Sequence, residues 1–302
     1  MVSDSIHIAL VANDRYRPGL ASTRRSMTDA AAHPDRLVFH EFGEADMTPF
    51  LPRFPLADYN GSKLPYLRLF LPELLPACDW VIYADVDTLW FRDPEELWNE
   101  RDETKSVCWV ADVPSTQQSF AKWAVSKDLD VKIAGAYACS GVVLVNLRKW
   151  RETSFTARAI EFFKRYGCPP YPDQDMMNVL FAQDAKMLPA EWNCIIPPVP
   201  WRPCVVHLVG VGLRFGSDRY EGSTPAYLFW FDYYREKILH LPRYVPTSAV
   251  RIRLALLSSL QTLLGAFLAF LYRLPLPFAV QYQVVRLRRQ LNWAKIVVRR
   301  RA

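Results

Sequence analysis

Residues 80–87 read Trp80-Val81-Ile82-Tyr83-Ala84-Asp85-Val86-Asp87, in which five apolar residues run directly into two aspartates that flank a valine. A short, continuous apolar run of this kind is typical of a strand that is buried on both faces, as the strands of parallel sheets are. In such sheets, ligands bind at the carboxyl ends of the strands. The segment therefore predicts a buried strand over 80–84 whose polar tip belongs to a ligand site.

The rest of the chain repeats this pattern. Further apolar runs that predict strands occupy residues 6–12, 37–42, 107–111, 142–145 and 205–208. Helical spacing occurs over 20–31, 64–75, 147–166, 174–181 and 226–239. Strands that alternate with helices predict an α/β domain with a mainly parallel central sheet. Because Asn13 and Asp112 follow predicted strands and His207 lies at the end of one, we expect them at the same edge as Asp85 and Asp87.

Charge is distributed unevenly along the 302 residues, whose formal net charge is +6. Residues 243–302 contain eleven Lys or Arg and no Asp or Glu, so residues 1–242 keep 26 basic and all 31 acidic residues, a net charge of −5. This division predicts an acidic catalytic body over 1–242 and a basic tail over 243–302. An acidic body argues against nucleic acid as the partner, and 51% apolar residues exclude wholesale disorder.

The tail combines basic and apolar residues at helical spacing. Residues 254–272 carry no charge, and their polar positions gather on one side of a helix. Beyond Pro275 and Pro277, an apolar stripe over 280–298 is flanked by arginines. Basic amphipathic helices favour attachment to an anionic lipid surface. Packing against the body and a true membrane span are the alternatives.

The cysteines and the N-terminus indicate a reducing compartment. The six cysteines include no CxxC pair, which favours buried thiols over disulfides or a zinc site. The first residues carry no basic segment followed by an apolar run, so no signal peptide is predicted. We therefore expect a cytoplasmic protein that is peripherally associated with the inner face of the cell membrane.

The pair Asp85 and Asp87 indicates a site for a hard divalent cation. Carboxylates suit Mg²⁺ or Mn²⁺, and a cation held by them can neutralise a diphosphate. Without a cation or protons, two carboxylates between apolar segments would repel each other and lose solvation. Metal-dependent nucleotide-sugar glycosyltransferases use such a pair. So do haloacid-dehalogenase-type phosphatases, whose DxDxT motif Asp85-Val86-Asp87-Thr88 matches, although they carry it on their first strand.

Six sequence blocks, in order, resemble glycosyltransferase family 8, and the bacterial lipopolysaccharide galactosyl- and glucosyltransferases in particular. They are Tyr66-Leu67-Arg68-Leu69, Tyr83-Ala84-Asp85-Val86-Asp87, Ser140-Gly141-Val142-Val143, Asp173-Gln174-Asp175, Trp192-Asn193, and His207 with Gly210. The resemblance implies a GT-A fold, a UDP-sugar donor, Mn²⁺ with Mg²⁺ as the alternative, and transfer of a hexose to a glycan or glycolipid acceptor with retention of configuration.

The resemblance also assigns roles to individual residues. The matching metal ligands are Asp85, Asp87 and His207. The positions that match the donor site are Val11, Asn13, Tyr16, Arg68, Asp85, Gly141, Gly210 and Arg214. Those that match the catalytic groups are Asp173, Gln174 and Asp175, with Asp112 as a further acid. Asp112 could instead cap a turn, and Asp175 could cap a helix. A front-face route and a covalent intermediate both stay open for the reaction.

Three positions depart from the family pattern. Asn13 stands where members often have Asp, and Cys139-Ser140-Gly141 replaces Asn-Ala-Gly near the donor sugar. Leu213 occupies the place of a lysine on the diphosphate, so we expect the neighbouring Arg214 to supply the charge. These changes keep a further alternative open, a degenerate nucleotide-sugar-binding protein without catalysis.

Overall fold

The computed structural model describes residues 5–53, 58–59, 62–129, 137–195, 203–209, 230–245 and 247–249, together with 252, 263 and 267. The expectations for Gly210, Leu213, Arg214 and most of the tail fall outside these described residues. Among the described residues, none of the helices combines the length and hydropathy that crossing a bilayer requires.

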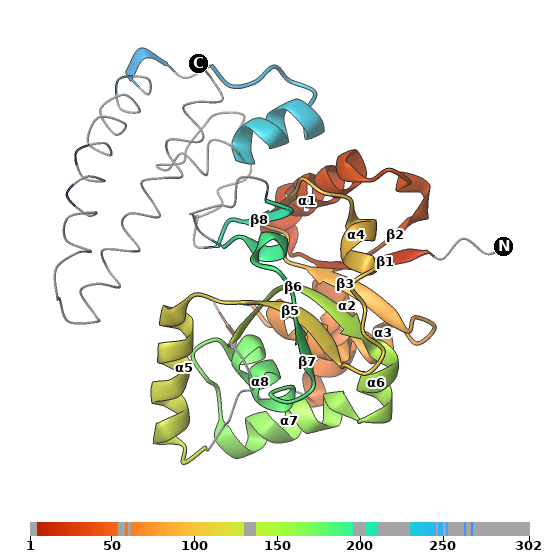
Figure 1. Ribbon diagram of the computed structural model, residues 1–302, viewed down its shortest axis with the longest axis vertical. Helices are drawn as coiled ribbons and strands as arrows, with labels where there is room; N and C mark the ends of the chain where they lie inside the picture. Colours follow the sequence, from red (N-terminus) through yellow and green to blue (C-terminus); the bar gives the residue numbers. More distant parts are fainter. Residues whose placement is uncertain are drawn as a thin grey trace.

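A six-stranded sheet with the order β2-β1-β3-β6-β5-β7 forms the centre of the fold (Figure 1). Its strands are β1 (Ile6–Val11), β2 (Leu37–Phe42), β3 (Trp80–Ala84), β5 (Val107–Ala111), β6 (Ala138–Asn146) and β7 (Ala185–Met187). Strand β1 is parallel to β2 and β3, and β5 is parallel to β7, whereas β6 is antiparallel to both of its neighbours. Five of the six strands thus run in one direction, which confirms the mainly parallel sheet.

The reversed direction of β6 has a consequence for the site. Its first residues lie where β3 and β5 end, because Ala84 pairs with Val142 and Ala111 pairs with Ala138. The backbone N–H of Asp85 donates to the carbonyl oxygen of Gly141 over 2.7 Å. The start of β6 therefore meets the aspartate pair at the carboxyl edge of the sheet.

A second, two-stranded ladder continues from the aspartate pair. Strand β4 (Thr88–Trp90) follows Asp87 directly and is antiparallel to β8 (Val205–His207). Thr88 is paired with His207, and the N–H of Leu208 donates to the carbonyl oxygen of Asp87 over 2.9 Å. This ladder places His207 beside Asp87.

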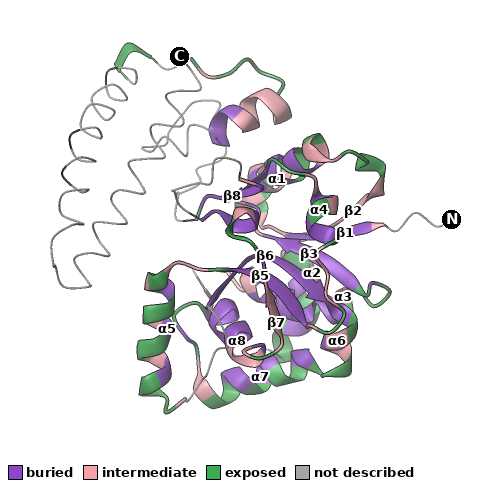
Figure 2. Ribbon diagram, viewed as in Figure 1, coloured by how far each residue is buried: buried purple, intermediate pink, exposed green. Residues whose placement is uncertain are grey.

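Helices cover both faces of the central sheet (Figures 1 and 2). Strands β3 and β6 are buried throughout, whereas the edge strands β2 and β7 are partly exposed. The helices are α1 (Arg17–Ala30), α2 (Glu44–Met47), α3 (Leu71–Leu74), α4 (Pro94–Trp98), α5 (Pro114–Ser126), α6 (Leu147–Glu152), α7 (Phe155–Tyr166) and α8 (Pro172–Leu180). Alternating residues of β3 enter different cores, as the period of a strand dictates. Val81 belongs to the core of α6, α7 and α8, and Ile82 belongs to the core that contains Met27 of α1 and Trp98 of α4.

Proline and backbone geometry divide two of the predicted helices. The segment 64–75 is a 3₁₀-helix over Leu64–Phe70 followed by α3, because Pro72 has no N–H with which to continue a helix. The predicted helix 147–166 is split between α6 and α7, where Ser154 adopts a left-handed conformation with φ of 50°. Helices α2, α4 and α5 and strands β4 and β7 were not predicted.

Candidate active site

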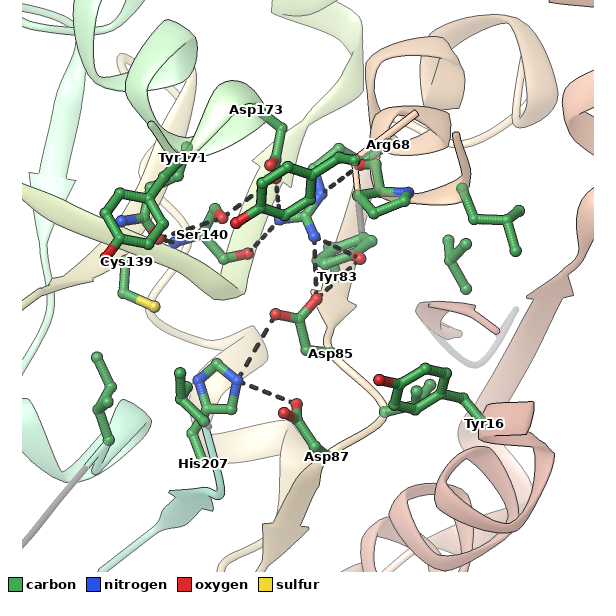
Figure 3. Close-up of a pocket in the computed structure, with 18 of the residues that line it drawn as sticks. Tyr16, Arg68, Tyr83, Asp85, Asp87, Cys139, Ser140, Tyr171, Asp173 and His207 are labelled. Carbon is green, nitrogen blue, oxygen red and sulfur yellow. Dashed lines mark hydrogen bonds and ion pairs between the residues drawn. The ribbon is translucent and has the colours of Figure 1, made fainter. Parts of the chain in front are cut away.

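A cavity of about 940 Å³ lies at the carboxyl edge of the central sheet (Figure 3). It is bounded by the residues that follow β1, β3 and β5, by the start of β6, by the first turn of α8 and by the end of β8. Of the predicted site residues, those that line it are Val11, Asn13, Tyr16, Arg68, Asp85, Asp87, Asp112, Asp173, Gln174 and His207. The chain thus brings together at one cavity residues that are almost 200 positions apart.

Asp85, Asp87 and His207 form a compact triad on the floor of this cavity. Nε2 of His207 lies 3.0 Å from a carboxylate oxygen of Asp87 and 3.6 Å from one of Asp85. One carboxylate oxygen from each aspartate and one ring nitrogen of His207 all lie within 4.8 Å of one another. Two carboxylates and an imidazole are donors that suit Mn²⁺, so these residues fit a divalent cation.

Asn193 orients His207 within the triad. Nδ1 of His207 lies 3.0 Å from the side-chain oxygen of Asn193, and both residues are buried. Because an amide oxygen only accepts, Nδ1 carries the proton and Nε2 faces the carboxylates. A partner of this kind fixes the tautomer of a ligating histidine. The sequence offered one signal for Asn193, its position next to Trp192 in a family block, and no role was predicted from it.

Gly141 makes room for the triad. A Cβ atom at this position would lie 2.1 Å from Cε1 of His207 and 3.0 Å from Oδ2 of Asp85. Because His207 is hydrogen-bonded to Asn193 and Asp85 to Arg68 and Tyr83, a methyl group here would displace side chains from these bonds. Glycine is therefore required at position 141 by the close approach of the imidazole.

The triad favours positive charge at its centre. Burial alone would lower the pKa of His207, but the adjacent Asp87 carboxylate and its hydrogen bond raise that pKa well above its usual value. Burial would raise the pKa of Asp87, yet His207 lowers it overall. Burial raises the pKa of Asp85 against the opposing effects of Arg68 and His207. A bound cation would therefore compete with the proton on His207.

Arg68 is a buried link between two acids of the cavity. Its guanidinium donates to the carbonyl oxygens of Pro65 and Ser140, to the hydroxyl of Tyr83 and to Asp85, and it forms an ion pair of 3.0 Å with Asp173. All five N–H groups can thus be assigned to protein partners. A direct contact with a donor phosphate would require Arg68 to release one of them, so the structure favours a role in holding Asp85 and Asp173 (Figure 3).

Gln174 has a fixed orientation in the wall of the cavity. Its side-chain oxygen accepts from the N–H of Ser140 over 2.9 Å. Its amide nitrogen donates to Asp112 over 2.7 Å and to the hydroxyl of Tyr137 over 3.0 Å. Ser140 and Tyr137 were not predicted as partners, because the side-chain contacts between β6 and α8 leave no trace in sequence spacing.

Asp175 lies behind this wall. It is fully buried, it does not line the cavity, and it accepts from the N–H of Tyr171 over 2.8 Å and from the hydroxyl of Tyr137. Burial raises its pKa to about 7, although both hydrogen bonds oppose the rise. The geometry gives Asp175 contact with the hydroxyl that holds Gln174 and none with the cavity itself.

The remaining predicted positions divide between the cavity wall and local caps. The side-chain oxygen of Asn13 accepts from the N–H of Tyr16 over 3.2 Å and caps a short 3₁₀-helix over Asp14–Tyr16. Asp112 accepts from the N–H of Val113 and so has the predicted turn contact, while it also lines the cavity. Burial raises the pKa of Asp112.

The central sheet and the helices that cover it have the GT-A architecture. Residues 25–200 match the family model of glycosyl transferase family 8, and the chain therefore belongs to this family. The resemblance seen in the sequence is thus confirmed.

Curated relatives carry related names. The chain is 34% identical over 136 residues to a lipopolysaccharide 1,2-glucosyltransferase of Escherichia coli K12. The aligned region covers 44% of this chain and 39% of that protein. It is 29% identical over 165 residues to a putative glycosyltransferase of Haemophilus influenzae, which covers 54% of this chain and 48% of the relative. The chain therefore matches less than half the length of these relatives.

Solved structures share the fold. A galactosyltransferase, LgtC, in complex with donor and acceptor sugar analogues superposes with a TM-score of 0.59 at 20% identity, over 80% of this chain and 98% of that one. The apo structure of the bifunctional glycosyltransferase WbbM gives 0.61 at 18% identity, over 80% of this chain and 51% of that one. These likenesses confirm the predicted GT-A architecture.

Proposed function

We propose that this chain is a metal-dependent, retaining hexosyltransferase that moves a glucose- or galactose-class sugar from a UDP-sugar to a glycan or lipid-linked acceptor, in the synthesis of lipopolysaccharide or another cell-surface glycan. The observation that carries the proposal is the triad of Asp85, Asp87 and His207 in one cavity with Gln174. Membership of family 8 and the names of the relatives support it.

The triad would hold Mn²⁺, which when bound supplies positive charge for the diphosphate of the donor and for the departing UDP. Val11, Asn13 and Tyr16 line the side of the cavity where the nucleoside would bind. Asp173, which lines the cavity and is paired with Arg68, would accept hydrogen bonds from sugar hydroxyls. Gln174 presents a rigid amide to the reacting face, since both ends of its side chain are hydrogen-bonded.

The phosphatase alternative is not favoured. The DxDxT motif of this chain follows β3, whereas that class carries it on the first strand. A non-catalytic binding protein is also less favoured, because the triad, Asp173 and Gln174 are all in place in the cavity.

A screen of UDP-hexoses tests the proposed reaction. We expect purified protein with Mn²⁺ to release UDP from UDP-glucose or UDP-galactose. Excess EDTA should abolish the release, because the departing UDP loses the cation that neutralises its charge. A UDP release assay on a panel of UDP-sugars measures this. Release that is undiminished by EDTA, or hydrolysis of phosphomonoesters in its place, would contradict the proposal.

We further propose that the basic tail attaches the enzyme to an anionic, cytoplasmic membrane surface. The support is compositional: residues 243–302 carry eleven basic and no acidic residues. Each cation near an anionic surface contributes about 1 kcal/mol of attraction.

Removing residues after Pro246 is expected to abolish binding to vesicles that contain phosphatidylglycerol while UDP-sugar hydrolysis persists. Co-sedimentation with these vesicles, and with vesicles of phosphatidylcholine alone as the control, measures the binding. Equal binding of the truncated and full-length chains would contradict the proposal.

A further inference from the structure

A second cluster of metal-ligating side chains lies away from the cavity. His7 lies on β1, His40 lies on β2, and Cys78 precedes β3 by two residues. A ligand atom from each of the three lies within 4.8 Å of the others. His7 lies near the amino-terminal end of β1 and Cys78 lies just before β3, whereas the cavity lies at the carboxyl ends of the strands. No step of the proposed transfer uses these side chains.

The register of the sheet brings the two histidines together. Strands β1 and β2 are parallel, with His7 opposite Val38 and Ala9 opposite His40. Residues two apart on a strand share a face, so His7 and His40 are diagonal neighbours on the face that carries Ala9. Ala9 belongs to the same core as Cys78. A small side chain at position 9 leaves the imidazoles close to the thiol.

The distance between two ring nitrogens of the histidines is near that of two nitrogens that bind the same metal ion. Nδ1 of His7 lies 3.0 Å from Nε2 of His40. Two imidazole nitrogens bound tetrahedrally at 2.0–2.1 Å would be separated by about 3.4 Å, so the rings need to part by only a few tenths of an ångström. The site is therefore close to a coordinating arrangement.

Burial and neighbouring charges affect two members of the cluster. Burial, and then the neighbouring His7, lower the pKa of His40. Burial raises the pKa of the Cys78 thiol, and the nearby Arg151 opposes the rise. Arg151 donates to the carbonyl oxygen of Cys78 and is itself paired with Asp79 at 3.1 Å, which offsets its charge.

We propose that His7, His40 and Cys78 bind a borderline-soft divalent cation of the zinc class, with water as a fourth ligand. Two imidazoles and a thiolate favour Zn²⁺ or Co²⁺ over Mn²⁺ and Mg²⁺, which prefer oxygen. Binding replaces the thiol proton, which is released to solvent, by a metal–sulfur bond. The cysteine spacing favoured buried thiols over a zinc site, and this proposal departs from that expectation for Cys78.

Cobalt spectroscopy on the full-length, metal-free protein tests this site. Addition of Co²⁺ is expected to produce a thiolate-to-cobalt charge-transfer band in the near ultraviolet, and one equivalent of Zn²⁺ should remove it. Cys78→Ser should abolish the band, because no other described thiol lies in this cluster. His40→Asn should weaken Zn²⁺ binding at least tenfold in competition with a chromophoric chelator.

Two controls separate this site from the proposed active site. Cys139→Ser removes the thiol that lies in the cavity near His207, and Asp87→Asn removes a ligand of the triad; both should keep the charge-transfer band. Far-ultraviolet circular dichroism shows whether each variant is folded. A missing band in the folded wild type, or a band that survives in Cys78→Ser and is lost in Cys139→Ser, would overturn the proposal and leave the transferase proposal untouched.

Discussion

Asp87→Asn is expected to reduce Mn²⁺-dependent UDP release on the order of 10³-fold while the chain remains folded. Loss of an outer-shell partner of a metal ligand already costs roughly 10–100-fold, and Asp87 is itself a proposed ligand. The amide can still accept a hydrogen bond from His207, so the local geometry is kept while the negative charge is lost. Initial rates across a Mn²⁺ titration, together with Mn²⁺ binding followed by electron paramagnetic resonance, measure the effect.

The matched control for this substitution is Asp35→Asn. It makes the same chemical change at an exposed residue in the connection between α1 and β2. We expect wild-type rates and wild-type Mn²⁺ affinity from it. If Asp87→Asn retained more than about a tenth of the wild-type rate at the same Mn²⁺ concentration, Asp87 would not be a ligand of a catalytic metal.

Gly141→Ala is expected to weaken Mn²⁺ binding on the order of 10²-fold and to reduce UDP release by at least as much. The added methyl group would meet His207 at 2.1 Å, so the imidazole has to move out of its place between Asn193 and the carboxylates. Overpacking of this kind typically costs about 1–3 kcal/mol of stability, which a domain of this size tolerates. Mn²⁺ binding, UDP release and thermal unfolding are measured on the same preparation.

Gly43→Ala serves as the control for the added methyl group. A Cβ at position 43 would meet only the carbonyl oxygen of Ala12, at an ordinary contact distance of 3.6 Å. Its φ of −134° is open to alanine. Gly43→Ala should therefore bind Mn²⁺ as the wild type does. Wild-type Mn²⁺ affinity in Gly141→Ala would show that His207 is not needed for the metal site.

The sequence predicted the sheet and the polar positions at its edge because both depend on local patterns. The apolar run over 80–84 is a strand, and Asp85 and Asp87 follow it at the cavity. Helices α2, α4 and α5 and strands β4 and β7 escaped prediction for local reasons. Helix α5 has few apolar residues at helical spacing, and each of the other four elements is only three to five residues long.

The packing within the site could not be predicted in the same way. The support that Asn193 gives His207 joins residues 14 positions apart. The partners of Arg68 outside its own helix come from three separate segments, at Tyr83 and Asp85, at Ser140 and at Asp173. Such contacts depend on the tertiary fold. The cluster of His7, His40 and Cys78 is a similar case, because its members share no spacing motif and meet only through strand register.

Because β8 pairs with β4, the proposed metal would also link two distant segments of the chain. His207 is the last residue of the three-residue strand β8, whereas both aspartates lie in the turn after β3. A cation shared among them would act as a removable cross-link between two segments that are far apart along the chain, and closing so long a loop restricts the unfolded state strongly. Occupancy of the metal would therefore govern how firmly the C-terminal part of the catalytic domain is fastened to the rest, as a disulfide does in secreted proteins.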